Sequence, residues 1–131
     1  MSGKLLTMKL LKEHFGVCRL GKDEIIPEWL KNSEFYSITK TAEELSIVCS
    51  QNCIPSDIKC ENNWRSLKVE GPLDFSLIGI MSSISTILAQ EKISIFAIST
   101  YDTDYILVKD NDIANAVNAL SSENYEILDN Y

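Results

Sequence analysis

Two strand-like runs lie almost next to each other in the second half of this sequence. Residues 93–100 (ISIFAIST) and 104–109 (DYILVK) are rich in β-branched and aromatic residues, and only residues 101–103 separate them. Such runs with a short connection indicate an antiparallel β-hairpin. A hairpin by itself is barely stable in water, so the flanking segments decide what the chain can fold into.

A helix pattern lies on each side of this hairpin. Apolar residues at helical spacing form one broad face upstream of it, at Leu77, Ile80, Met81, Ile84, Ile87 and Leu88. A second such face follows it, at Ile113, Ala116, Val117 and Leu120. Strand patterns over residues 64–70 and 125–128 complete the order βαββαβ. This order predicts an α+β, ferredoxin-like fold, in which both helices cover one face of a four-stranded antiparallel sheet.

The first half of the chain has less regular patterns. Strands are predicted over residues 4–12, 15–20, 35–39 and 45–50. Thr41 and Glu44 have the spacing of a capping box, which predicts a very short helix before the last of these strands. Residues 51–63 include Pro55 and several polar residues and predict an irregular connection. We therefore expect two modules, over residues 1–63 and 64–131.

Composition restricts the partners of the chain. Nineteen acidic and 12 basic residues give a formal net charge of −7, whereas proteins that bind nucleic acid neutralise phosphates with Lys and Arg. The longest mostly apolar stretch, residues 75–89, is interrupted by Ser and Thr, and no basic leader precedes an apolar core at the N-terminus. We expect a cytoplasmic protein that binds neither nucleic acid nor membrane.

The four cysteines, Cys18, Cys49, Cys53 and Cys60, allow more than one interpretation. Two disulfides would fit a secreted chain, but no signal peptide is recognised. A structural zinc site would need closely paired ligands and a fourth partner, and the sequence has no CxxC pair. We expect reduced thiols, with Cys18 and Cys49 buried as small apolar residues, and neither metal nor cofactor.

No catalytic signature occurs in the sequence. The phosphate loop GxxxxGK[ST], the metal motif HExxH and the nucleophile motif GxSxG are all absent. His14 and Cys18 could share one face of a strand, and Asp102 and Asp104 could form a carboxylate pair, but no further group supports either arrangement. We expect no enzyme activity and no catalytic residue.

Three segments of the second half form a long combined pattern, namely VEGPLDFSLIGI at residues 69–80, ISIFAISTYDTDYILVK at residues 93–109, and DNDIANAVNAL in the second helix. They resemble the ACT domains, in particular those of the CASTOR-type arginine sensors and related bacterial proteins. The resemblance covers the last half of the chain, and residues 39–49 (TKTAEELSIVC) look like a first, degenerate ACT-like module. It implies a regulatory module that binds an amino acid or similar small metabolite at an interface between modules or subunits.

The resemblance also implies where that ligand binds, namely around the first helix start and in the hairpin. The expected site residues are Asp74, Phe75, Ser76, Gly79, Thr100, Tyr101, Asp102 and Asp104. Asp74 can either cap the helix or meet an ammonium group of the ligand. Asp102 and Asp104 can either meet a cationic ligand side chain or serve as ordinary turn residues.

The sheet face without helices needs a partner in this fold. N-terminal strands could extend the sheet, and a second copy of the chain could cover the remaining surface, so we expect a homodimer. The alternative to a metabolite sensor is a ligand-independent interaction module that docks an unidentified protein on this face.

Overall fold

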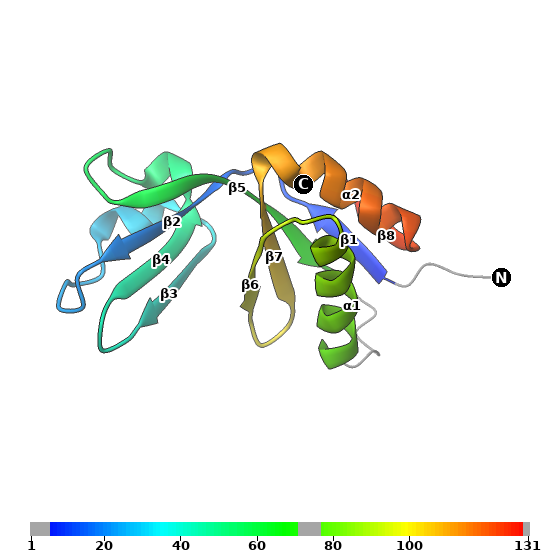
Figure 1. Ribbon diagram of the computed structural model, residues 1–131. Coiled ribbons are helices and arrows are strands. Elements are labelled where there is room, and N and C mark those ends of the chain that lie inside the picture. Colours follow the sequence, from blue (N-terminus) through cyan, green and yellow to red (C-terminus); the bar gives the residue numbers. More distant parts are fainter. Residues whose placement is uncertain (1–5, 71–76, 130–131) are drawn as a thin grey trace. The chain divides into compact units, whose positions relative to one another are not determined.

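A computed structural model describes residues 6–70 and 77–129, with the backbone alone for residues 77 and 78 (Figure 1). The chain forms two compact units. The C-terminal unit comprises Met1–Lys12 and Arg65–Tyr131, and the N-terminal unit comprises Glu13–Trp64. This division differs from the predicted modules because the first strand of the chain pairs inside the C-terminal unit.

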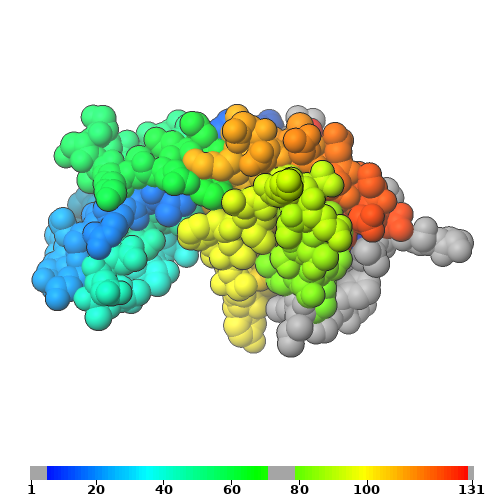
Figure 2. Space-filling model, viewed as in Figure 1, coloured from blue at the N-terminus to red at the C-terminus, as the bar shows by residue number. Residues whose placement is uncertain are grey.

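The C-terminal unit has the predicted order of elements. It contains β1 (Leu6–Leu10), the second part of β5 (Cys60–Val69), α1 (Leu77–Gln90), β6 (Ile95–Ser99), β7 (Asp104–Lys109), the 3-10 turn η3 (Asp110–Asp112), α2 (Ile113–Ser122) and β8 (Tyr125–Leu128). Figure 1 shows α1 and α2 on the same face of the sheet, and Figure 2 shows them side by side in yellow-green and orange. The α+β, ferredoxin-like prediction is confirmed from β5 onward.

One feature of this sheet was not predicted. Its strand order is β6-β7-β5-β1-β8, with β1 antiparallel to β5 and parallel to β8. The predicted four-stranded sheet was therefore wrong in this detail, since β1 is inserted between the first and last strands instead of extending an edge. Leu6, Met8 and Leu10 explain the insertion, because these alternate residues are all buried in the core that the helices cover.

The core of this unit lies between the helices and the sheet. Ile84, Leu88 and Leu120 are fully buried and pack on apolar side chains of β1, β5 and β7. The helical faces predicted from the sequence are confirmed for the described side chains, to which that of Leu77 does not belong, and Met81 and Val117 pack at the border of the core.

The opposite face of β1, β5 and β8 is polar. Thr7, Lys9, Lys68 and Glu126 alternate along these strands with core residues. The ammonium groups of Lys9 and Lys68 lie 3.6 and 3.4 Å from the Glu70 carboxylate, and Thr7 donates a hydrogen bond of 3.0 Å to Glu126. The helix-free face of the sheet, which was expected to need a partner, is therefore covered on these three strands by their own long charged side chains.

The N-terminal unit is built almost entirely from strands. It contains β2 (Phe15–Leu20), the 3-10 turn η1 (Glu28–Asn32), β3 (Tyr36–Lys40), β4 (Leu45–Ser50), the 3-10 turn η2 (Gln51–Cys53) and the first part of β5. The strand order is β3-β4-β2-β5, and all these neighbours are antiparallel. This is the strand order of a ferredoxin-like unit, with a short 3-10 turn in place of each helix.

Two local predictions in this unit were wrong. Thr41 and Glu44 do not begin a helix but form the hairpin turn between β3 and β4, in which the Thr41 hydroxyl accepts backbone hydrogen bonds of 3.1 Å from Glu43 and Glu44. A Thr hydroxyl can satisfy such amides in a turn as well as at a helix start. The predicted irregular connection also ends early, because β5 begins at Cys60 and pairs with β2 through its backbone despite its polar side chains.

Candidate functional site

The turn between β6 and β7 is closed by two threonines. The Thr100 amide donates to the Thr103 carbonyl at 2.7 Å, and the Thr103 amide donates to the Thr100 hydroxyl at 3.2 Å. The Thr100 hydroxyl also donates to the Thr103 carbonyl at 3.1 Å. These bonds hold the turn without any contribution from the side chains at its tip.

Thr103 connects this turn to the end of β5. Its hydroxyl donates a buried hydrogen bond of 2.5 Å to the carbonyl of Val69, the last residue of β5. The start of β7 is thereby fixed beside the point where the chain leaves β5 toward α1. The hairpin, one of the two segments expected to hold the ligand, is therefore attached to the end of β5 in the C-terminal unit.

Among the predicted site residues that the structure describes, Asp104 has the most unusual environment. It opens β7 and is only 2% exposed. Its alternation with Ile106 and Val108, both in the core cluster, places it on the face that the helices cover. Within the described ranges, its Oδ2 atom is buried and accepts no hydrogen bond. A buried acceptor without a donor is uncommon and points to a missing partner.

The other predicted residues of the hairpin and helix lie differently. Tyr101 and Asp102 are exposed at the hairpin tip, as expected of turn residues, and Figure 2 shows the yellow hairpin end standing out from the surface. Gly79 is exposed on α1, and a Cβ atom there would meet nothing within 4 Å. The structure thus separates Asp104 from Asp102, so the two do not act as a carboxylate pair.

Three predicted site residues, Asp74, Phe75 and Ser76, lie outside the described residues. Conversely, Thr103 was not predicted as a site residue, although it joins the hairpin to β5. The sequence carries no signal for this role, because a threonine between two aspartates in a short connection is equally typical of a turn.

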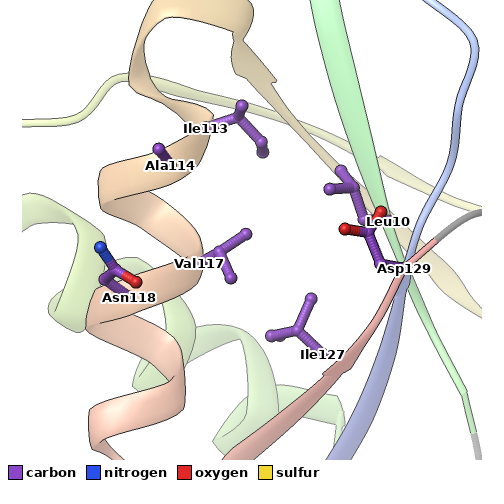
Figure 3. A pocket seen from close by; sticks show the side chains of 7 residues that line it. All are labelled: Leu10, Ile113, Ala114, Val117, Asn118, Ile127 and Asp129. Atoms are coloured by element: carbon purple, nitrogen blue, oxygen red, sulfur yellow. The ribbon is translucent and has the colours of Figure 1, made fainter.

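A shallow hollow lies elsewhere in the same unit, between α2 and the strands (Figure 3). It has a volume of about 360 Å³ and is lined by Leu10, Ile113, Ala114, Val117, Asn118, Ile127 and Asp129. In Figure 3, Ile113 and Val117 project from α2 into the hollow, and Leu10, Ile127 and Asp129 line the side opposite this helix. This hollow is mainly apolar and contains none of the predicted residues, so it is a poorer match for a zwitterion than the Asp104 site.

Two absences hold for the part of the chain that the structure describes, one of a metal-ligand cluster and one of a membrane-spanning helix. Residues 6–70 and 77–129 contain no group of three or more His, Cys, Asp or Glu side chains that could hold a metal ion. Asp104 alone could not provide the several oxygen ligands that calcium or magnesium needs, so an organic cation suits it better. No helix in these residues has the length and apolar character needed to cross a bilayer.

Two family models match the chain. One is described as an ACT domain and matches residues 59–122, which covers β5 through α2. The other is described as an N-terminal domain and matches residues 13–57, which lie in the N-terminal unit.

Curated relatives match about two thirds of the chain. The human protein CASTOR3P is 33% identical over 103 residues, which are 69% of this chain and 63% of the relative. The bovine (Bos taurus) cytosolic arginine sensor for mTORC1 subunit 1 is 28% identical over 101 residues, which are 69% of this chain and 31% of the relative. The match thus spans less than two thirds of either relative.

Solved structures agree with these matches. An Agrobacterium tumefaciens protein has a TM-score of 0.91 and 36% identity, with 96% of this chain and 94% of that chain covered. The regulatory subunit of aspartate kinase from Thermus thermophilus has a TM-score of 0.57 at 11% identity, covering 92% of this chain and 97% of that one, which shows a shared fold. Together with the βαββαβ order, the family-model match establishes that this chain contains an ACT domain at residues 59–122.

Proposed function

We propose that the chain is a non-catalytic regulatory module that binds an amino acid or similar small metabolite, and that Asp104 meets a cationic group of this ligand. The observation that carries the proposal is the buried Asp104 side chain, whose Oδ2 atom accepts no hydrogen bond from the described residues. Burying a carboxylate oxygen without a hydrogen-bond donor is unfavourable unless something else compensates for it. The ammonium or guanidinium group of a ligand would supply that compensation through charge-assisted hydrogen bonds.

The position of Asp104 supports a zwitterionic ligand. Thr103 fixes the start of β7 against the end of β5, from which the chain continues to α1. Free backbone amides at the start of a helix attract anions, and they could receive the ligand carboxylate while Asp104 receives its cationic group. We include Asp74, Phe75, Ser76 and Gly79 in the proposed site because they lead into or lie in the first turn of this helix.

A basic amino acid is the first ligand to test. One relative is named a cytosolic arginine sensor, and a guanidinium group matches the two oxygens of a carboxylate. Isothermal titration calorimetry with arginine, lysine and ornithine should give a binding heat for the full chain. Alanine and glutamate serve as neutral and acidic comparisons.

Two variants make this experiment specific. Asp104→Asn removes the buried charge, whereas Asp102→Asn removes the exposed charge two residues away. We expect the first variant to bind roughly 10 to 100 times more weakly, because hydrogen bonds to charged groups contribute about 1.5–3 kcal/mol. The second should bind like the native chain. Equal losses in both variants would contradict the role of Asp104.

We also propose that two copies of the chain associate. The polar face of β1, β5 and β8 does not favour the predicted face-to-face contact, but β6 pairs with β7 alone among the described strands. An edge strand of this kind can pair with a second copy. Light scattering after size-exclusion chromatography tests this, and a monomer at micromolar concentration would exclude the homodimer. If the calorimetry shows no ligand, the ligand-independent docking module becomes the better explanation.

A further inference from the structure

The four cysteines gather in the apolar core of the N-terminal unit. Cys18 and Cys49 are 1% and 0% exposed, and Cys53 and Cys60 are half-buried beside them. All four are free thiols in the structure. They come from β2, β4, η2 and β5, so only the tertiary fold brings them together.

The thiols form a chain of neighbours. The Cys53 thiol contacts the Cys49 sulfur at 3.8 Å and donates to the Ser50 carbonyl at 3.1 Å. Cys49 in turn hydrogen bonds with Cys18, and Cys18 hydrogen bonds with Cys60. The order of contacts is therefore Cys60, Cys18, Cys49, Cys53.

These contacts and the burial of the cluster shift the pKa values of three of the thiols in different directions. The hydrogen bond from Cys49 lowers the pKa of Cys18, while the same bond raises the pKa of Cys49. Burial is the largest cause that raises the pKa of Cys60. Cys18 is thus well suited to become the thiolate that attacks a mixed disulfide already formed on a neighbouring, more exposed cysteine.

Cys18 and Cys60 have the geometry of a cross-strand pair. They are directly opposite each other in the pairing of β2 with β5. The neighbouring residues Arg19 and Lys59 share a backbone hydrogen bond of 3.0 Å, so the cysteines occupy a non-hydrogen-bonded position. At such positions the Cα atoms are about 4.5 Å apart, which lies within the range that a disulfide can join.

We propose that this cluster is a reversible oxidation site that forms two disulfides, Cys18–Cys60 and Cys49–Cys53. Four cysteines allow three pairings, and this is the one in which both bonds join thiols already in contact. Each bond links one buried thiol with a half-buried one that a small oxidant can reach.

A small disulfide such as oxidised glutathione can serve as the oxidant that accepts the electrons of the thiols. The thiolate of the half-buried cysteine attacks one glutathione sulfur and releases one molecule of reduced glutathione. The buried neighbour, after losing its proton to water, attacks the resulting mixed disulfide and releases the second. Two protein thiols lose two electrons and two protons, and one glutathione disulfide gains them as two thiols.

Peptide mapping tests the pairing directly on the full chain. The protein is incubated with oxidised glutathione, its remaining thiols are alkylated, and it is digested with trypsin without reductant. Cleavage after Lys and Arg places Cys18 in residues 13–19, Cys49 and Cys53 together in residues 41–59, and Cys60 in residues 60–65. We expect the peptide of residues 13–19 to be linked to the peptide of residues 60–65. We also expect the peptide of residues 41–59 to carry no alkyl group and no linked peptide, and to weigh two hydrogens less than its reduced form.

Every other result contradicts the proposal. Any other pairing of all four cysteines would join the three peptides into one species. Four alkylated cysteines, or glutathione adducts alone, would show that the thiols do not pair. A dithiol reductant should restore four alkylatable cysteines, and failure to do so would contradict a reversible site.

Melting curves of two variants provide an independent readout. Cys60→Ser and Cys53→Ser each replace one half-buried thiol, so neither substitution opens a cavity in the centre of the core. Oxidation should raise the melting temperature of the native chain by roughly 10 °C, because a disulfide that closes a long loop restricts the unfolded chain most. Cys53→Ser, which keeps the bond from residue 18 to residue 60, should retain most of this shift, and Cys60→Ser should lose most of it. The reverse order would overturn the assignment of the pairs.

Discussion

Replacing Asp104 with valine should make the unliganded protein more stable. Most substitutions at buried positions destabilise a protein, so this prediction has an unusual sign. Asp104 is 2% exposed, and its Oδ2 atom is one of the few buried side-chain atoms without a hydrogen bond in the described part of the chain. An unsatisfied buried polar group costs about 1–3 kcal/mol, and valine removes it while suiting a β-strand.

The expected gain is therefore about 1–3 kcal/mol in the free energy of unfolding. It should appear in urea denaturation followed by circular dichroism, as a higher midpoint with an unchanged slope. In thermal unfolding it corresponds to about 4 °C for each kcal/mol in a chain of 131 residues. The exposed Asp102 provides the control, because Asp102→Val should change the stability by less than about 0.5 kcal/mol.

Adding the ligand provides a second comparison between the native chain and the Asp104→Val variant. At a free concentration 100 times its Kd, a ligand stabilises the native chain by about 2.7 kcal/mol, whereas Asp104→Val should gain nothing from the same addition. If Asp104→Val instead unfolds more easily than the native chain, the carboxylate contributes to the fold itself. The reasoning that assigns it to a ligand would then be refuted.

Three further substitutions test the structure around this site. Thr103→Val removes the buried hydrogen bond to the Val69 carbonyl and should lower the free energy of unfolding by about 1–3 kcal/mol, measured by urea denaturation; an unchanged midpoint would contradict this contact. Ile84→Ala empties a fully buried position in the C-terminal core and should cost about 2–5 kcal/mol in the same assay, whereas a smaller loss would mean that α1 packs loosely. Tyr125→Phe removes a hydrogen bond of 2.7 Å to Ser83 and should lower stability by about 0.5–1.5 kcal/mol, with no effect if water replaces the contact.

The elements of the second half could be predicted because their patterns are local. Ile80, Ile84 and Leu88 repeat at helical spacing and are buried along one side of α1. The runs that became β6 and β7 are separated by so few residues that a hairpin was the natural consequence. Patterns of this kind follow from the geometry of the helix or strand itself, so they do not depend on which segment it packs against.

The failures occurred where a distant partner decides the outcome. The turn at Thr41 uses the hydrogen bonds of a helix start, yet the pairing of β3 with β4 determines its conformation. The polar residues that begin β5 resemble a loop, yet their backbone pairs with β2. Local sequence could not reveal either result, because tertiary pairing overrides weak local preferences.

The sequence by itself thus determined the order of strands and helices, the faces that the helices bury, and Asp104 as one of several candidate residues. The tertiary structure alone decided that β1 enters the middle of the C-terminal sheet, that Asp104 is buried while Asp102 is exposed, and that four separated cysteines meet in one core. The physical reason is that periodicity records which side of an element faces the core. Burial of a particular atom and contacts between remote residues depend on what other segments place there.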